Sequence, residues 1–402
     1  MEFDYIELGS GLLKIIDYRG KTPQKLGSTW TDYGKRVISA KNVHGGTLDN
    51  IDSIRCVTDE VYSKWMKDEI QRNDILLASE GASMGESMLW ESDEKVVLGQ
   101  RLFCLRCNTA ILNPFYLAMY MRTPDYRSEL VNHSTGTSVM GLRQPALLKT
   151  KIRNIPIQLQ NKIGEIYRII LRKIELNQKT NENLEQQVMT LFQHMFIECE
   201  NKKRCICPAG EYFDISIGKT PPRKEAQWFS DNSSDCVWVS ISDMGNCGLY
   251  ISDSSEYLTQ EAVAKFNVKM VPDNTVLLSF KLTVGRIVIT DGVMATNEAI
   301  AHFKTDKLEI NEYLYCYLKR FNYQAMGSTS SIATAVNSKI IKEMPFIIPT
   351  DEELAIFHRF SAPLFAMIKS NQQENVRLAT LRDTLLPKLM AGKIDISITK
   401  DL

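Results

Sequence analysis

The sequence predicts an α+β fold in which two related, strand-rich domains are each followed by one long helix. Three observations support this prediction: an internal repeat, short β-branched runs in both halves, and a long hydrophobic seam late in each half. A chain of 402 residues is also longer than one ordinary domain.

The repeat is clearest in its second part. The stretch "IELNQKTNENLEQQVMTLFQHMF" aligns without a gap with "IKSNQQENVRLATLRDTLLPKLM", with Ile174 matching Ile368 at an offset of 368 − 174 = 194. Upstream, Lys21-Thr22-Pro23 matches Lys219-Thr220-Pro221 at an offset of 219 − 21 = 198. The offset drifts because loops between strands tolerate insertions and deletions.

Within each half, runs of apolar and β-branched residues between polar turns predict strands. These runs are "KRVISAKNV", "CVWVSISDM", "DILLAS", "KVVLGQRLFCLRC" and "GRIVITDG". The stretch "NPFYLAMYMRT" predicts a helix with Asn113 as N-cap and Pro114 at its first position. Its counterpart in the second half begins at Asn311, for which we also expect a cap.

Long helices are predicted over residues 159–196 and 351–390 because apolar residues recur there in alternating steps of four and three. Two asparagines interrupt the middle of each seam: Asn177 and Asn181 in the first, Asn371 and Asn375 in the second. Antiparallel pairing would place Asn177 near Asn375 and Asn181 near Asn371, so that each amide finds a partner. We hypothesise that the helices pack antiparallel and that the asparagines fix their register. Parallel pairing would also match asparagine with asparagine.

Bulk composition favours a globular protein with 44% hydrophobic and 24% charged residues. The start "MEFDYIELGS" lacks the pattern of a signal peptide, and no apolar run reaches the length of a membrane helix, so we expect a cytoplasmic protein without membrane association. Formal net charge is zero, which means that any nucleic-acid surface must be a local patch.

The order of these motifs and their duplication resemble those of the specificity subunit of type I restriction–modification systems. The resemblance rests on "RGKTPQ" (19–24) and "GKTPPR" (218–223), on "NDILLAS" (73–79) and "NTVLLSF" (274–280), and on "GTSVMGLRQPALLKTKIRNIPIQL" (136–159). The end of the chain, "LRDTLLPKLMAGKIDI" (381–396), is similar to the carboxyl terminus of that family. The likeness covers nearly the whole chain.

The resemblance implies two target-recognition domains, residues 1–158 and 200–350, separated by a long antiparallel two-helix coiled-coil spacer made of residues 159–199 and 351–392, with a tail at 393–402. Each domain would read one half of a bipartite, asymmetric target in double-stranded DNA. The helices would set the gap and dock two adenine-N6 methyltransferase subunits, and ATP-dependent restriction subunits would join for cleavage. S-adenosylmethionine, ATP and Mg²⁺ are expected on those partner subunits and no cofactor on this chain.

The chain carries no convincing active site, so we expect it not to be an enzyme. Asn113-Pro114-Phe115-Tyr116 resembles the motif with which amino-methyltransferases hold the target amine, but its repeat counterpart has no proline, and a helix cap explains both copies. Cys104 and Cys107 have the spacing of a zinc knuckle, yet they lie in an apolar, strand-like run without a second pair of ligands at zinc-finger spacing.

Residues that can reach phosphates and base edges, next to glycines in loops, are the candidate DNA contacts. In the first half they are Arg19, Lys21, Lys41, Asn42, His44, Ser83, Thr137, Ser138, Arg143 and Gln144. In the second half they are Lys219, Arg223, Lys224, Ser242, Lys281, Arg286, Ser328, Thr329, Ser330 and Asn337.

A competing hypothesis is a two-headed coiled-coil adaptor whose domains bind proteins or glycans. Salt separates the two, because DNA binding weakens steeply as ionic strength rises.

Overall fold

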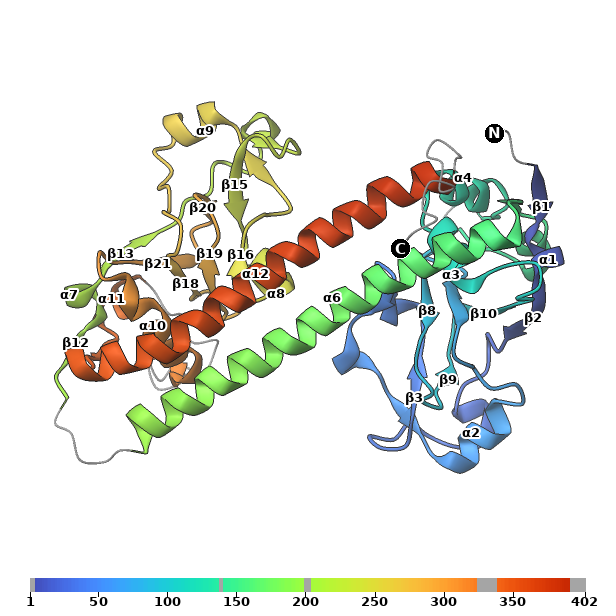
Figure 1. The fold of residues 1–402 in the computed structure, drawn as a ribbon, viewed down its shortest axis with the longest axis horizontal. Helices are drawn as coiled ribbons and strands as arrows, with labels where there is room; N and C mark the ends of the chain where they lie inside the picture. The colour runs from blue at the N-terminus through green and yellow to red at the C-terminus, as the bar shows by residue number, and fades with distance from the viewer. Residues whose placement is uncertain (1–3, 137–139, 199–203, 324–337, 391–402) are drawn as a thin grey trace. The chain divides into compact units, whose positions relative to one another are not determined.

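The computed structural model describes residues 4–136, 140–198, 204–323 and 338–390. The chain divides into two compact units: unit 1 contains Met1–Lys173 and Arg377–Leu402, and unit 2 contains Ile174–Val376. The strand-rich part of unit 1 is called the first head below, and that of unit 2 the second head (Figure 1). The division of the sequence at residues 158, 199, 350 and 392 stays a prediction.

The main sheet of the first head is antiparallel and has the strand order β2-β10-β7-β8. Its strands are β2 (Leu12–Asp17), β7 (Asp74–Ala78), β8 (Ser87–Trp90) and β10 (Leu102–Cys107). Every residue of β7 and β8 is buried. The predicted strands "DILLAS" and "LFCLRC" are therefore the two central strands of this sheet.

The main sheet of the second head repeats this order as β13-β21-β18-β19, with β16 added at the edge. Its strands are β13 (Asp214–Ile217), β16 (Tyr250–Ile251), β18 (Val276–Ser279), β19 (Ile287–Thr290) and β21 (Ile300–Lys304). β18 and β19 are fully buried, as β7 and β8 are. The internal repeat of the sequence is thus a repeat of the fold.

Smaller sheets also correspond between the heads. The sheet β6-β3-β9 of the first head has its counterpart in β14-β17-β15-β20, and the pair β1-β11 in β12-β22. The first head's strands are β1 (Tyr5–Glu7), β3 (Lys35–Ile38), β4 (Val43–His44), β5 (Thr47–Leu48), β6 (Cys56–Val57), β9 (Val97–Leu98) and β11 (Lys151–Arg153). The second head's strands are β12 (Ile206–Pro208), β14 (Phe229–Ser230), β15 (Cys236–Val239), β17 (Tyr257–Leu258), β20 (Ala295–Thr296) and β22 (Pro345–Ile347).

Short helices join these strands. In the first head they are α1 (Leu8–Gly11), α2 (Asp59–Trp65), α3 (Pro114–Tyr120), α4 (Pro124–Asn132) and α5 (Gln144–Leu148). In the second head they are α7 (Ala209–Tyr212), α8 (Ile241–Asn246), α9 (Gln260–Lys265), α10 (Asn311–Arg320) and α11 (Ser338–Glu343). The sequence "CVWVSISDM", predicted as one strand, is a strand only to Val239: Ser240 caps a helix there, so the prediction was wrong for its second half.

The two long helices are α6 (Ile157–Phe192), which ends in a π-helical turn (Gln193–Ile197), and α12 (Asp351–Met390). Within unit 2 they run antiparallel: Asn177 Nδ2 lies 2.9 Å from Asn375 Oδ1, and Asn371 Nδ2 lies 2.8 Å from Asn181 Oδ1. The residue numbers rise along one helix and fall along the other, with 177 + 375 = 181 + 371 = 552. The α+β fold with two strand-rich parts and an antiparallel helix pair is confirmed.

Aromatic and aliphatic side chains fill the space between the helices and the second head. Phe192 at the end of α6 and Phe196 in the π-helical turn contact Phe357 of α12, at ring-centroid distances of 6.1 and 5.3 Å. Tyr313 of α10 joins the same cluster, 4.7 Å from Phe196. Burial of such rings is the main source of stability for a junction of this kind. No helix among the described residues is long and apolar enough to span a membrane.

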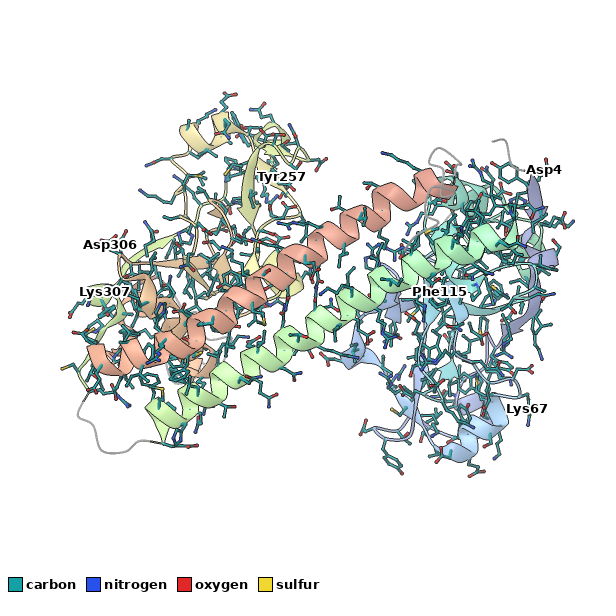
Figure 2. All side chains as sticks on the ribbon, viewed as in Figure 1. Asp4, Lys67, Phe115, Tyr257, Asp306 and Lys307 are labelled. Carbon is teal, nitrogen blue, oxygen red and sulfur yellow. The ribbon has the colours of Figure 1, made fainter. Side chains whose placement is uncertain are left out.

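A close approach joins α3 to α6 in unit 1, where Phe115 lies beside the helix (Figure 2). A Cβ at Gly164 would meet Asn113 Oδ1 at 2.5 Å, so only glycine fits there. Asn113 Oδ1 also accepts hydrogen bonds from the backbone N–H groups of Phe115 and Tyr116, at 2.9 and 3.1 Å. The predicted N-cap at Asn113 is confirmed.

The expected cap at Asn311 is wrong. A 3₁₀ turn (Leu308–Ile310) leads directly into α10, so that Asn311 already has helical backbone angles. Its Nδ2 instead donates to the backbone oxygen of Asn274 at 2.6 Å. The same residue type therefore caps a helix in one head and holds a loop in the other.

Candidate nucleic-acid interface

A short capped turn stands in the same place in both heads. Ser39 and Asn42 form a capping box in the first head, with Ser39 Oγ donating to Asn42 Oδ1 at 2.8 Å. Ser240 and Asp243 form the same box in the second head, where Ser240 Oγ donates to Asp243 Oδ2 at 2.6 Å. The box satisfies backbone donors that the start of a helical turn leaves free. It fixes the shape of the turn, in which Lys41 and Ser242 are exposed while Ala40 and Ile241 are buried.

A hairpin loop lies next to each capped turn. It joins β7 to β8 through residues 79–86 in the first head and β18 to β19 through residues 280–286 in the second. Gly81 (φ +84°) and Leu282 (φ +59°) both have left-handed backbone conformations near the start of these loops. Leucine rarely adopts this conformation, and the Leu282 side chain is 98% exposed.

A third element, the turn at residues 99–101 of the first head and 297–299 of the second, completes the surface. Gly99 N donates to Ile38 O at 2.7 Å, and Asn297 N donates to Val239 O at 3.0 Å, so each turn is tied to the strand that leads into the capped turn. Arg101 has φ +62°, an uncommon conformation for a residue with a side chain. We call the capped turn, the hairpin loop and this turn the three-loop surface of each head.

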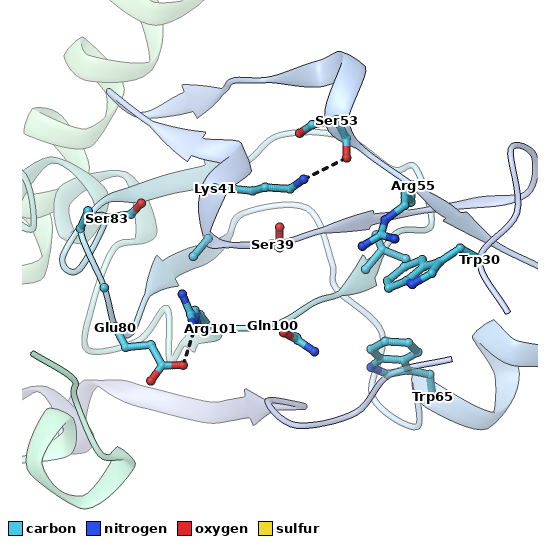
Figure 3. Close-up of a pocket in the computed structure, with 14 residues that line it drawn as sticks. Trp30, Ser39, Lys41, Ser53, Arg55, Trp65, Glu80, Ser83, Gln100 and Arg101 are labelled. Carbon is cyan, nitrogen blue, oxygen red and sulfur yellow. Dashed lines mark hydrogen bonds and ion pairs between the residues drawn. The ribbon is translucent and has the colours of Figure 1, made fainter. Parts of the chain in front are cut away.

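In the first head the three loops enclose a cleft of about 370 Å³ (Figure 3). Its wall carries three cationic side chains, Lys41, Arg55 and Arg101, and one carboxylate, Glu80. The Arg55 guanidinium stacks on the Trp30 ring at 4.1 Å, Arg101 Nε lies 3.3 Å from Glu80 Oε1, and Lys41 Nζ donates to the backbone oxygen of Ser53 at 3.2 Å. The remaining lining residues are Val37, Ser39, Ala40, Ser53, Trp65, Gly81, Ala82, Ser83 and Gln100.

The second head presents different chemistry on the same scaffold. Ser242 stands where the first head has Lys41, Lys281 where it has Glu80, and Glu298 where it has Gln100. Arg286 of the hairpin loop donates through Nη1 to the backbone oxygen of Ile241 in the capped turn, at 2.6 Å. Equivalent loops therefore differ in charge, as two surfaces with different partners would.

Several candidate contacts of the first head are engaged inside the fold. Arg19 pairs with Asp17 at 2.8 Å, and Lys21 Nζ donates to the backbone oxygen of Trp65 at 2.8 Å. Burial, and to a smaller extent the nearby charge of Lys67, lowers the pKa of Lys21. Asn42 is fully buried and bonded within its loop, so in this structure it shapes the turn and is not itself accessible.

The other described candidates of the first head lie nearer to solvent. Lys41 and Ser83, chosen from distant parts of the sequence, line the same cleft. His44 and Arg143 are exposed, and Gln144 is half-buried at the start of α5. Backbone bonds from Gly81 N to Met140 O (3.1 Å) and from Leu142 N to Ser79 O (2.7 Å) hold the segment before Arg143 against the hairpin loop.

In the second head the exposed candidates are Lys219, Lys224, Ser242 and Lys281. Arg223 is also exposed but pairs with Glu256 at 2.6 Å and lies over the rings of Phe229 and Trp238. Thr137, Ser138, Ser328, Thr329, Ser330 and Asn337 lie outside the described residues. That any of these side chains contacts DNA stays a prediction.

Residues at the cleft that the sequence reasoning missed are Trp30, Arg55, Trp65, Gln100 and Arg101. The repeat contained a signal for one of them, since Trp30 aligns with Trp228 at 228 − 30 = 198, the offset of the Lys-Thr-Pro motif. Gln100 and Arg101 lie inside a run predicted as one continuous strand. The chain turns there, between β9 and β10.

The cysteines and histidines of the described residues do not form a reactive centre. Cys104 and Cys107 lie on β10, where burial raises the pKa of Cys107 to about 12 and also raises that of Cys104 well above its ordinary value, so both thiols stay protonated. No group of three or more potential metal ligands is found in the described part of the chain. His302 is buried between Ser216 and Thr296, and burial lowers its pKa to about 4, which keeps the ring neutral.

The chain resembles known proteins in both sequence and fold. The family model "Type I restriction modification DNA specificity domain" matches residues 6–186 and 207–379. The chain is 22% identical over 415 residues to the type I restriction enzyme HindI specificity subunit of Haemophilus influenzae, covering 82% of this chain and 88% of that protein. It is 24% identical over 306 residues to the MjaIX specificity subunit of Methanocaldococcus jannaschii, covering 70% and 69%. The crystal structure of a type I S subunit from M. genitalium has the same fold, with a TM-score of 0.54, 16% identity and 96% of both chains covered.

Proposed function

The chain belongs to the family of type I restriction–modification DNA specificity subunits, and on this premise we propose that each head reads one half of a bipartite DNA target through its three-loop surface. The specificity subunit supplies the sequence preference of the complex. A two-headed adaptor for proteins or glycans is not favoured by the comparisons.

One observation carries the proposal: the same strand order in both heads presents equivalent loops with different side chains. Lysine, arginine, glutamine, serine and glutamate are the side chains that contact base edges and phosphates. Because Lys41, Glu80 and Gln100 are replaced by Ser242, Lys281 and Glu298, the two half-targets should differ in sequence.

The antiparallel helix pair supports a role for the helices in setting the unspecified gap between the half-targets. Reading two separated half-sites requires a fixed spacing between the reading elements. We assign to the same helices the docking of two adenine-N6 methyltransferase subunits, joined for cleavage by ATP-dependent restriction subunits. S-adenosylmethionine, ATP and Mg²⁺ then bind to those partners, and this chain contributes recognition without catalysis.

Methylation of the host genome tests the proposal. Methylome sequencing with the gene intact and deleted should show one bipartite adenine-methylated motif that disappears with the gene. Exchanging the three second-head residues for their first-head counterparts (Ser242→Lys, Lys281→Glu and Glu298→Gln) should alter one half of the motif and leave the other half and the gap unchanged. A change in both halves, or no dependence of methylation on the gene, contradicts the proposal.

A further inference from the structure

The cleft of the first head contains a buried hydrogen-bond donor that no group in the described residues satisfies. Trp65 lines the cleft and its side chain is 1% exposed. Its indole Nε1–H has no hydrogen-bond acceptor in the described part of the structure. A buried donor without a partner costs about 1–3 kcal/mol, which an acceptor entering the cleft would recover.

The second head has a different residue at the position equivalent to Trp65. Trp65 is the last residue of α2, which Thr58 caps, and the corresponding residue of the second head is Phe266, directly after α9, which Thr259 caps, at 266 − 65 = 201. Phe266 packs edge-on against Trp228, the counterpart of Trp30, with ring centroids 5.3 Å apart. The second head thus lacks the N–H donor of Trp65, and its two rings are in contact.

The walls of the first cleft define the chemistry of an occupant. Trp30 and Trp65 line one end of the cleft, and Gln100 lies beside them (Figure 3). Lys41, Arg55 and Arg101 supply positive charge, with Glu80 as the one carboxylate of the lining. Aromatic walls with amide and indole donors suit a planar base, and the cations suit its phosphate.

Resting on the proposed function, we propose that this cleft receives one base of the target DNA that has left the helical stack. The base lies against the aromatic end of the cleft and accepts a hydrogen bond from Trp65 Nε1–H, while Gln100 contacts its edge. Its phosphates lie toward Lys41 and Arg101. The first half-target therefore contains one position that is read outside the duplex, and the second head has Phe266 in place of Trp65.

A mismatch scan tests the proposal with the full chain and duplexes that carry the target found by methylome sequencing. A base that must leave its pair does so more easily when the pair is weakened. We expect a mismatch at one position of the first half-target to tighten binding of the unaltered protein by about tenfold, measured by fluorescence anisotropy. If every mismatch weakens binding, the cleft holds no extruded base.

Trp65→Phe removes the donor and keeps most of the ring. It should weaken binding of the matched duplex about five- to thirtyfold and abolish the gain at the mismatched position. Trp90→Phe is the matched control, because Trp90 Nε1 is also buried and without an acceptor among the described residues, yet Trp90 does not line the cleft. Gln100→Ala, at an exposed position, repeats the test without disturbing the core. Equal effects of Trp65→Phe and Trp90→Phe overturn the proposal.

Competition with free deoxynucleoside monophosphates shows whether the cleft requires a base within a DNA strand or binds an isolated nucleotide. We expect them to compete only weakly, at millimolar concentration, because they lack the rest of the DNA contact. Strong binding of a monophosphate together with a flat mismatch scan overturns the assignment to DNA. Duplex binding that keeps its sequence preference in Trp65→Phe and Gln100→Ala also overturns this inference and leaves the proposed function standing. If the unaltered protein shows no sequence-dependent DNA binding, the proposed function itself is contradicted.

Discussion

Asn42 and Asp243 occupy the same position of the two capped turns, one with a neutral amide and the other with a carboxylate. Burial acts to raise the pKa of Asp243, but hydrogen bonds from Ser240 and Ser255 outweigh burial and lower it. A carboxyl group with a lowered folded-state pKa stabilises the fold fully above its ordinary value of 3.8. This stabilisation is lost as the pH falls below that value.

We therefore predict that the capped turn of the second head opens more readily between pH 4 and pH 3, by about 1 kcal/mol. Hydrogen exchange of residues 240–246, followed by mass spectrometry and corrected for intrinsic rates, measures this change. Asp243→Asn should remove the pH dependence, and residues 39–44 of the first head serve as the internal control. Equal pH dependence in the two turns would show that Asp243 is not its source.

Leu282 combines a left-handed backbone with almost complete exposure. Its conformation costs about 1 kcal/mol and its side chain recovers little of this through burial. Leu282→Gly should raise the free energy of unfolding by about 0.5–1 kcal/mol in denaturant titrations, because glycine adopts the conformation without strain. Leu282→Ala keeps the strain and should give no gain. A gain in both variants would point to the exposed side chain instead.

The asparagine pairs between the two long helices contribute to the free energy of unfolding, and this contribution can be measured. Asn177 Nδ2 donates to both Asn375 Oδ1 and Glu374 Oε2, at 2.9 and 2.7 Å. Asn177→Leu alone leaves Asn375 without this partner and should lower the free energy of unfolding by about 1–3 kcal/mol. Asn177→Leu combined with Asn375→Leu should recover most of the loss, because two apolar residues pack well at facing positions. A double-mutant cycle with no coupling contradicts the pairing.

Register is a separate prediction about the same helices. Cysteines introduced at Val188 and Leu364 occupy one layer, since 188 + 364 = 552, the sum at both asparagine pairs. We expect them to form a disulfide in the chain with its asparagines intact. When all four asparagines are replaced by leucine, a chain with cysteines at positions 188 and 357 should form a disulfide as well, since Phe357 is one heptad away from Leu364. Peptide mass analysis separates these bridges from those of natural cysteines.

Sequence patterns predicted the helices and the central strands because these elements bury a periodic set of side chains. In the helix predicted over residues 159–196, the apolar residues Ile163, Tyr167 and Ile170 recur in steps of four and three, and all three are buried, as this spacing indicated. Local chemistry without periodicity was harder to interpret. Asn311 looked like a second cap because Asn113 is one, but the preceding 3₁₀ turn, which depends on tertiary contacts, decides its role.

The site was predicted only in part for the same reason. Lys41 and Ser83 were chosen for their residue type, and the sheet brings them to one cleft. Trp65 and Arg55 were missed because a single tryptophan or arginine carries no sign of what it faces. Their roles depend on three loops separated in sequence and joined by the fold.

At the scale of the whole molecule, a formal net charge of zero means that DNA affinity depends on local cations. We predict that affinity for the target duplex falls by at least tenfold between 50 and 200 mM salt. Neutralising Lys41 and Arg101 together should weaken binding and reduce the slope of log affinity against log salt by up to about two. Neutralising Lys95, an exposed lysine paired with Glu69 at 3.0 Å, is the control and should leave the slope unchanged. A slope that is insensitive to all three residues places the phosphate contacts elsewhere.

The fixed register of the two helices, in which the residue numbers of each asparagine pair sum to 552, limits how the two halves of the gene can change independently. Each asparagine layer takes one residue from each copy of an ancient duplication, so a substitution in one helix is felt by its partner in the other. Residues 246–249 of the second head line a pocket together with Asn181 and Asn375, so this head also lies against the layers. A second head exchanged by recombination in the two helical segments must therefore keep side chains that fit Asn181 and Asn375 at these positions, or the register of the helix pair changes with it.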